Sequence, residues 1–337
     1  MNVKKCITMI ISLLIFFSSA LTVNAEERYY GNYTYTLLKN KTIKLVSYDG
    51  NDERINIPSK IKGKKVTVLG KNLFRSTHRI ISVKIPEGIT QIETEVFKDR
   101  KELKTVNFPK SLTQIGEGAF EGCKLLKSIE LGNKIKYIGN GAFLGTGYFY
   151  NADNWDGKKV FGGGLYIGKY MIYGQHISGD YNVKTGTVLI ADGVFDYCYD
   201  VESIKFPLSV KYINTGFNST KKLKKIKGYY NTVAEKYAKK NGVKFVALNP
   251  KTPKFKVKSG KKSFKVTYKK VKGAVGFQVK YKQGKTWKTK LYKTKKTVTK
   301  KIKAKKGTCK LKIRSYKKEF NQKIYSKWTK AKKVTVK

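Results

Sequence analysis

Residues 114–143 read QIGEGAFEGCKLLKSIELGNKIKYIGNGAF, and they contain one complete copy of an internal repeat. The repeat is marked by phenylalanines that stand 23 residues apart, at Phe74, Phe97, Phe120 and Phe143. Aliphatic residues follow them at constant offsets, for example Leu103 and Leu126 six residues later. One such unit cannot bury its apolar positions alone, whereas stacked units share a continuous core. The period therefore predicts a solenoid.

Each copy also contains a short alternating segment. Successive copies carry SVKIP, TVNFP and SIELG, and SIKFP follows later in the chain. Such segments predict short strands, which stacked coils would pair in parallel about 4.8 Å apart. The pattern resumes at Phe195, and a truncated last turn begins at Phe217. The 52 residues from Phe143 to Phe195 approach two turns, and we interpret them as longer repeats.

The repeat units resemble a known family. Residues 114–143 and the segment VLIADGVFDYCYDVESIKFPLSVKYI look like the bacterial surface leucine-rich repeats of the BspA-like (Treponema pallidum) type. The segments YTYTLL, IKLVSYDG and INIPSKIKGKKVTVLGKNLF resemble its N-terminal cap, and GYYNTVAEKYAKKNGVKFVAL resembles its closing helix and strand. The match covers residues 29–248. It implies an adhesion protein of the cell surface, since members of this family are linked to binding host matrix proteins.

Beyond Pro250 and Pro253 the 23-residue period gives way to strict alternation. The segment SFKVTYKKV places Phe264 and Val266 on one face and Lys265 on the other. Several such strands separated by turns predict a β-sandwich. The order of KVTYKKVKGAVGFQVKYK, KLKIRSYKK and IYSKWTKAKKVTVK resembles a bacterial fibronectin type III domain. The predicted fold class is therefore mainly β: a leucine-rich repeat solenoid at 26–248, followed by an Ig-like or fibronectin type III-like sandwich at 249–337.

The N-terminal 25 residues read as a secretory signal peptide. Lys4 and Lys5 precede an apolar run, and Val23, Asn24 and Ala25 form a small-residue cleavage site. No later run is apolar enough to span a membrane. The C-terminal VTVK lacks a wall-sorting signal. We therefore expect a mature chain that is secreted or held non-covalently at the cell surface.

Residues suited to catalysis or metal binding are sparse. The chain has two histidines, His78 and His176, and the mature part has Cys123, Cys198 and Cys309. A Cys198–His176 pair could form a nucleophile site, but Cys123 and Cys198 occupy the same repeat position and are better explained as core residues. The run GGLYIGKY lacks the hydroxyl of a phosphate loop and is interpreted as a turn between strands. We expect no catalytic residue, no metal and no cofactor.

Charge is the strongest functional signal. Residues 249–337 hold 34 Lys or Arg and one acidic residue, Glu319, whereas residues 26–248 hold 37 basic and 21 acidic residues. Such an excess strains a compact fold by self-repulsion, and an anionic partner would relieve it. The predicted polyanion-binding residues are Lys295, Lys296, Lys300, Lys301, Lys303, Lys305, Lys306, Lys310, Lys312 and Arg314.

The expected partner is an anionic cell-wall polymer such as teichoic acid, or an acidic glycan. The alternative is an extracellular matrix protein that binds nucleic acid without sequence specificity, and a secreted enzyme is the least favoured class. The solenoid offers a second surface, to which a host or neighbouring-cell protein or a glycan would bind. Its candidate residues alternate away from the core: Lys84, Asn107, Glu130 and Lys205.

Overall fold

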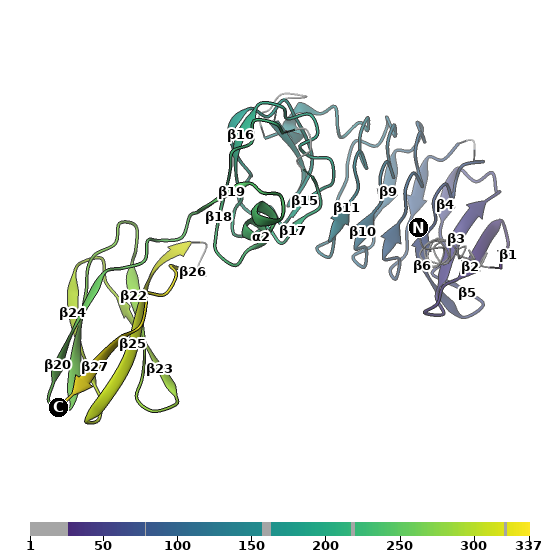
Figure 1. Cartoon of the computed structure of the whole chain (residues 1–337). Helices are drawn as coiled ribbons and strands as arrows, with labels where there is room; N and C mark the ends of the chain where they lie inside the picture. The colour runs from purple at the N-terminus through teal and green to yellow at the C-terminus, as the bar shows by residue number, and fades with distance from the viewer. Residues whose placement is uncertain (1–25, 78, 157–162, 217–219, 320–321) are drawn as a thin grey trace, which may run out of the picture. The chain divides into compact units, whose positions relative to one another are not determined.

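The computed structural model describes residues 26–77, 79–156, 163–216, 220–319 and 322–337 (Figure 1). The predicted signal peptide, His78 and the repeat position Phe217 lie outside the described residues. The chain divides into two compact units. The first holds the described residues up to His176 together with 189–197 and 214–216, and the second holds 177–188, 198–213 and the described residues from 220 onward.

The first unit is built on a ladder of strands that begins with an antiparallel cap. The cap strands are β1 (Arg28–Tyr30), β2 (Tyr33–Leu37) and β3 (Ile43–Tyr48), and β5 (Lys60–Ile61) forms a hairpin with β6 (Lys64–Leu69). Parallel strands β6, β8 (Gln91–Ile92), β10 (Gln114–Ile115) and β11 (Tyr137–Ile138) continue from β3. Ile92 pairs with Ile115, and Ile115 with Ile138, so the register of the ladder equals the sequence period.

A second parallel ladder joins β4 (Arg54–Asn56), β7 (Ser82–Lys84) and β9 (Thr105–Asn107). The strands expected from SVKIP and TVNFP are thereby confirmed, and they pair in parallel. The strand expected from SIELG is wrong, because residues 128–130 adopt no strand. One period further along the chain lies the 3-10 helix η1 (Ala152–Asn154), which offers no strand partner on that side.

The core of the first unit is a stack of phenylalanines. The ring centroids of Phe74 and Phe97 lie 5.1 Å apart, those of Phe97 and Phe120 5.0 Å, and those of Phe120 and Phe143 5.4 Å. All four side chains are buried. Glycine lets successive coils approach closely: a Cβ on Gly139 would lie 2.4 Å from the backbone nitrogen of Glu117. Equal spacing in sequence thus becomes one continuous aromatic column.

The long interval contains a hairpin of β12 (Gly163–Ile167) and β13 (Tyr170–Gln175), and β13 pairs in parallel with β15 (Leu189–Ile190). Gly168 turns the hairpin with φ +54°, so the interpretation of GGLYIGKY as a turn between strands is confirmed. Most aromatic residues of this interval are buried, namely Phe149, Trp155, Tyr166, Tyr170 and Tyr173. They pack the longer repeats, whereas Tyr150 is exposed.

The second unit continues the repeats. Strands β14 (Gly179–Asn182), β16 (Val201–Lys205), β18 (Lys225–Gly228) and β19 (Lys244–Ala247) pair in parallel, and β17 (Tyr212–Ile213) lies between β16 and β18 in sequence. Helix α2 (Val233–Lys240) contacts β18 and β19 and buries Ala234 and Ala238. The closing helix and strand expected from the sequence are both present.

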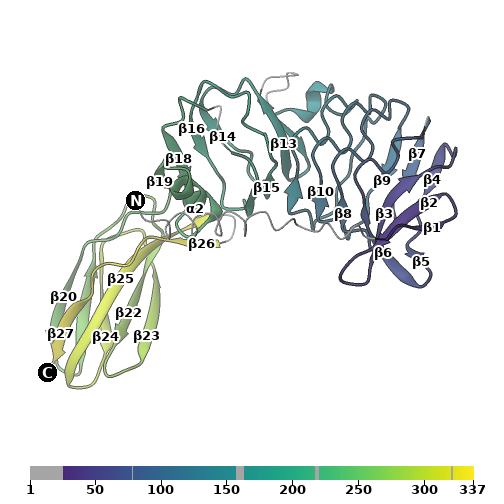
Figure 2. The same ribbon diagram turned by 45° about the vertical axis from the view of Figure 1, so that its right-hand side comes forward.

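Residues 255–336 of the second unit form two antiparallel sheets (Figure 2). One sheet contains β20 (Phe255–Gly260), β21 (Ser263–Tyr268) and β24 (Val298–Lys303). The other contains β22 (Gly276–Lys282), β23 (Trp287–Lys293), β25 (Gly307–Glu319), β26 (Gln322–Tyr325) and β27 (Lys332–Val336). Apolar residues of both sheets share one core, in which the rings of Tyr268 and Phe277 stack 4.3 Å apart. The lysine-rich end of the chain is therefore folded. We call residues 249–337 the C-terminal domain.

Candidate functional site

The predicted polyanion-binding residues are distributed over both sheets of the C-terminal domain. Strand β24 carries Lys300, Lys301 and Lys303 in the three-stranded sheet. Strand β25 carries Lys310, Lys312 and Arg314 in the five-stranded sheet. The remaining four lie in the loops beside β24, at Lys295, Lys296, Lys305 and Lys306. The structure therefore assigns these residues to different faces of the domain and not to one patch.

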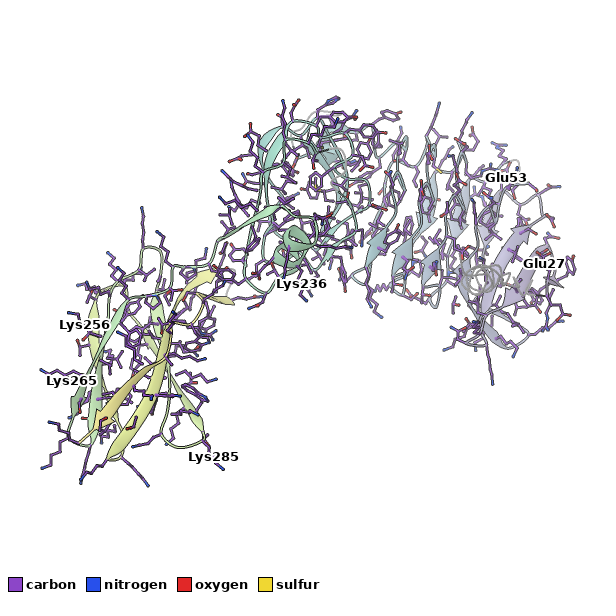
Figure 3. All side chains as sticks on the ribbon, viewed as in Figure 1. Glu27, Glu53, Lys236, Lys256, Lys265 and Lys285 are labelled. Atoms are coloured by element: carbon purple, nitrogen blue, oxygen red, sulfur yellow. The ribbon has the colours of Figure 1, made fainter. Side chains whose placement is uncertain are left out.

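A row of lysines crosses the three-stranded sheet. Lys258 pairs with Lys265, and Lys265 pairs with Lys301, and all three side chains are exposed. Figure 3 labels Lys265 on this sheet. Like charges placed directly opposite one another on a sheet are destabilising. Lys300 differs from its neighbours, because it is half-buried and its Nζ lies 5.8 Å from the ring centroid of Tyr292.

Several of the predicted lysines surround an open hollow in the C-terminal domain. The hollow has a volume of ≈ 1070 Å³, which lies at the upper end of the range of about 300–1,000 Å³ that is usual for ligand pockets. Lys303, Lys305 and Lys306 line it. The other lysines on its wall are Lys261, Lys262, Lys288 and Lys337. Because no carboxylate side chain lines it, the hollow concentrates positive charge in a concave site.

The five-stranded sheet presents a ladder of alternating cations and aromatic rings. The Nζ atoms of Lys280, Lys282 and Lys312 lie 5.6, 5.5 and 5.4 Å from the ring centroid of Trp287. Lys312 Nζ also lies 5.3 Å from the ring of Trp328. These distances are within the range of cation–π attraction. We call this group, together with Arg314 and Tyr325, the cation–aromatic ladder.

Arg314 completes the ladder at its far end. Its guanidinium carbon lies 4.4 Å from the ring centroid of Trp328 and 3.7 Å from that of Tyr325. Its Nε donates to Gln278 Oε1 at 2.7 Å. Burial lowers the pKa of Arg314 from its usual range, although the group stays charged at neutral pH. Arg314 is thus held between two rings, and it is less available to a ligand than the exposed lysines.

Trp287, Trp328 and Tyr325 are site residues that were not predicted from the sequence. Trp287 is the first residue of β23, and Trp328 follows β26, so neither stands inside a long alternating run. The pairing of strands brings these residues together: Trp287 lies opposite Lys282, and Lys280 lies opposite Lys312. Such pairing requires the strand register, which a single sequence does not contain.

The single acidic residue of the C-terminal domain is already engaged. Glu319 accepts a hydrogen bond from Tyr229 Oη at 2.6 Å and forms an ion pair with Lys317 at 2.9 Å. Burial acts to raise the pKa of Glu319, but the bonds from Tyr229 and Lys317 outweigh it and lower the pKa below its usual value. The ladder lysines therefore have no second carboxylate within residues 249–337 to pair with.

The four candidate residues on the repeats are all exposed, and the structure brings two of them together. Lys84 and Asn107 pair side by side on β7 and β9. Glu130 lies outside any strand, as described above. Lys205 lies on β16 in the second unit, where it pairs with Asn182 and Lys227.

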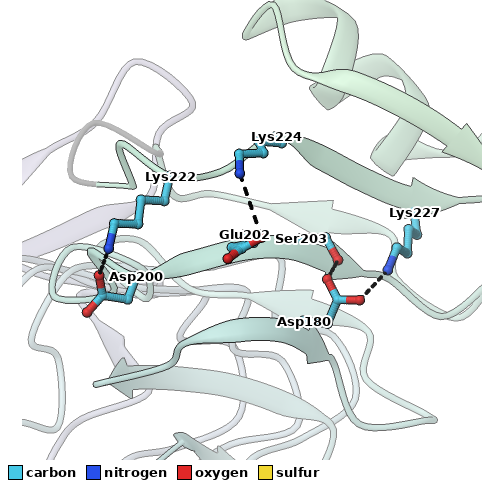
Figure 4. A network of polar contacts seen from close by, with 7 residues as sticks. All are labelled: Asp180, Asp200, Glu202, Ser203, Lys222, Lys224 and Lys227. Atoms are coloured by element: carbon cyan, nitrogen blue, oxygen red, sulfur yellow. Dashed lines mark hydrogen bonds and ion pairs between the residues drawn. The ribbon is translucent and has the colours of Figure 1, made fainter.

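A network of polar contacts connects strands β14, β16 and β18 (Figure 4). Asp180 accepts hydrogen bonds from Ser203 and, at 2.8 Å, from Lys227. These bonds, that from Lys227 first, lower the pKa of the Asp180 carboxyl. Lys222–Asp200 at 2.7 Å and Lys224–Glu202 at 3.8 Å add two further ion pairs. On the repeats, several lysines thus find acidic partners, whereas the C-terminal domain provides one acidic side chain, Glu319.

The three described cysteines are buried in the core, as expected. Burial raises the pKa of the Cys123 thiol to about 12, and its Sγ donates to the carbonyl of Phe97. Among the described residues, no group of three or more His, Cys, Asp or Glu is placed to hold a metal ion. In the same part of the chain, no helix is long and apolar enough to cross a membrane.

Comparison with known families assigns the repeats. Residues 67–178 and 163–238 match the BspA type leucine rich repeat region, in six copies. This match spans half of the chain, and the chain therefore belongs to the BspA-type leucine-rich repeat family. A comparison with curated proteins finds no match.

Several solved structures of bacterial leucine-rich repeat proteins are similar. One from Bacteroides capillosus is 25% identical, with a TM-score of 0.33, over 36% of this chain and 91% of the other. A leucine rich cell surface protein from Faecalibacterium prausnitzii is 17% identical, with a TM-score of 0.27, over 60% and 82%. The Treponema pallidum leucine rich repeat protein is 21% identical, with a TM-score of 0.29, over 66% and 98%.

Proposed function

We propose that this chain is an exported bacterial binding and adhesion protein, secreted or held non-covalently at the cell surface, and not an enzyme. Membership of the BspA-type family supports the binding role of the repeats. The similar protein from Faecalibacterium prausnitzii is described as a cell surface protein, and we propose the cell surface or the medium as the location of this chain. The ligand of the repeats would be a protein or a glycan, contacted through the face that carries Lys84 and Asn107.

The C-terminal domain would be an Ig-like or fibronectin type III-like sandwich that tethers the protein to polyanions. One observation carries this proposal: 34 basic residues and one acidic residue occupy 89 residues that fold into two sheets with a common core. Solubility of a small domain needs a net charge of only about 2–8. The hollow lined by Lys303, Lys305 and Lys306 is the proposed anchor point. Teichoic acid and acidic glycans are the expected ligands.

The tether is tested with the full chain on immobilised teichoic acid and on immobilised heparin, eluted with rising salt. Binding that rests on many lysine–anion contacts weakens steeply as salt rises. A triple variant, Lys303→Gln, Lys305→Gln and Lys306→Gln, should elute at lower salt than the wild type. The matched control, Lys39→Gln, Lys110→Gln and Lys134→Gln, removes the same charge from the repeats and should elute with the wild type.

Retention that does not respond to salt, or no retention on either polymer, would contradict the tether. The competing ligand is tested in the same assay by adding single-stranded DNA as a soluble competitor at equal charge. If DNA displaces the protein far better than teichoic acid or heparin does, the nucleic-acid-binding function replaces this proposal.

A further inference from the structure

The cation–aromatic ladder on the five-stranded sheet combines two features that bear on ligand binding. Three lysine ammonium groups converge on the ring of Trp287, each within 5.6 Å of its centroid. Any two of these ammonium groups are therefore no farther apart than about twice that distance. Trp287, Trp328 and all three lysines are partly exposed, so a ligand can reach them.

The lysines of the ladder repel one another across the strands. Lys280 lies directly opposite Lys312, and Lys282 lies directly opposite Lys310. Lys310 in turn pairs with Lys333 on β27. An aromatic ring attracts each cation through its quadrupole, but it carries no net charge that could neutralise them. Because Glu319 is bound to Lys317 and Tyr229, the domain has no further acidic side chain to offset this repulsion, and an anionic ligand bound at the ladder would relieve it.

We propose that the cation–aromatic ladder binds an acidic polysaccharide whose anionic group is attached directly to a sugar ring, as in polyuronates and sulfated glycans. The proposal rests on the tethering role of the C-terminal domain and specifies a second site for it. Such a sugar presents a face of C–H groups beside a carboxylate or sulfate. One sugar unit can therefore contact a tryptophan ring and a lysine at the same time.

The geometry favours this ligand over other polyanions. A polymer of glycerol phosphate has charge but no ring to cover Trp287 or Trp328. In a nucleic acid the stacking base is separated from the phosphate by the whole sugar, whereas each ladder ring has a cation 3.7–5.6 Å from its centroid. Rings and cations this close together match a ligand in which apolar face and charge are adjacent.

The test uses the full chain with polygalacturonate and heparin as acidic glycans, and with glycerol phosphate polymer and single-stranded DNA as comparison ligands at equal charge. The double variant Lys280→Gln, Lys312→Gln removes two ladder cations. It should weaken binding of the acidic glycans about tenfold, which corresponds to about 1.4 kcal/mol for the two partly exposed charge contacts together. The matched control Lys258→Gln, Lys265→Gln removes two exposed cations from the three-stranded sheet and should weaken binding clearly less.

Tryptophan fluorescence supplies an independent readout. The chain has three tryptophans, and Trp155 is buried in the repeats, so a change on adding ligand reports on Trp287 and Trp328. Polygalacturonate should change the emission of the wild type and of the control, and the change should diminish in Trp287→Leu. Glycerol phosphate polymer should leave the emission unchanged.

Equal weakening by the two double variants, or no fluorescence response to acidic glycan, would overturn the ladder site and leave the tether proposal intact. An equal fluorescence response to DNA would overturn the proposed ligand class. Absence of binding to every polyanion would instead refute the tether itself, so the two proposals fail on different results.

Discussion

The repeats and the C-terminal domain both carry aromatic ladders, but the two ladders serve opposite purposes. In the repeats, Phe74, Phe97, Phe120 and Phe143 stack on one another inside the core. In the C-terminal domain, Trp287, Trp328 and Tyr325 alternate with cations on the outer face of a sheet. Aromatic rings therefore stabilise the core of the repeats, whereas in the C-terminal domain they lie on a partly exposed surface beside cations.

The two regions also treat charge differently. On the repeats, lysines pair with nearby carboxylates, as in Lys44–Glu93 at 2.7 Å and Lys98–Glu121 at 2.9 Å. In the C-terminal domain, Lys265 on β21 pairs with Lys301 on β24. The one acidic residue of that domain is Glu319. The contrast shows that the repeats pair part of their positive charge internally, whereas the C-terminal domain has a single acidic side chain, Glu319, with which to do so.

The largest effect is expected from Phe120→Ala. Phe120 is fully buried between Phe97 and Phe143, so its loss leaves a cavity in the column and should lower the free energy of unfolding by about 3–5 kcal/mol. Urea unfolding followed by Trp155 fluorescence measures this, in a background with Trp287→Phe and Trp328→Phe. The exposed residue Leu291 serves as control, and Leu291→Ala should leave this transition unchanged. If Phe120→Ala lowers the free energy of unfolding no more than Leu291→Ala does, the phenylalanine column does not stabilise the repeats.

A smaller effect is expected from Gly139→Ala. The added Cβ would lie 2.4 Å from Glu117 N and 2.7 Å from Glu117 Cα in the preceding coil. Because two backbones meet there, the coils must separate, and we expect a loss of about 1–3 kcal/mol. The same Trp155 measurement detects it. Lys134→Ala, a change at an exposed position of the same coil, should have little effect. Equal stability of the two variants would show that the coils are not closely packed at Gly139.

The smallest effect, and the one that depends on pH, concerns Glu319→Gln. The folded-state pKa of Glu319 is lowered, so its charge stabilises the fold above the unfolded-state pKa of about 4.3, and that contribution is lost as pH falls through the folded-state pKa. We expect the variant to lose about 1 kcal/mol at neutral pH and to match the wild type in strong acid. Unfolding followed by Trp287 and Trp328 fluorescence, in a Trp155→Phe background, measures both conditions.

The exposed variant Glu130→Gln is the control for the Glu319 experiment, and it should show no such pH dependence. If the difference in free energy of unfolding between Glu319→Gln and the wild type is the same in strong acid as at neutral pH, the charge of Glu319 does not cause it.

The 23-residue period predicted much of the repeat fold because the register of a solenoid repeats its sequence period. Pairs such as Val83 with Val106 follow directly from that spacing. The ladder through Ile92, Ile115 and Ile138 was not predicted as strands, because a two-residue strand has no alternation to detect. At residues 128–130 the expected strand is absent although β9 lies in the preceding coil, and the next coil forms η1 in place of a strand.

In the C-terminal domain, the strands could be predicted from the sequence, but their assignment to sheets could not. Alternation in SFKVTYKKV and CKLKIRSY identified strands and their outward lysines, because a strand directs successive side chains to opposite faces. It could not assign β24 and β25 to different sheets. The ten residues predicted to bind a polyanion lie on both sheets and in the loops beside β24.

Sequence alone determined that the repeats stack, that the lysine-rich end contains strands, and that its positive charge has almost no acidic counterpart. These properties depend on spacing and composition, which are local or additive. Only the tertiary structure decided that Trp287 and Trp328 lie beside Lys312. It also decided that Lys303 lines one hollow together with Lys261 and Lys288. Such meetings depend on strand register and sheet order, which bring together residues that are distant along the chain.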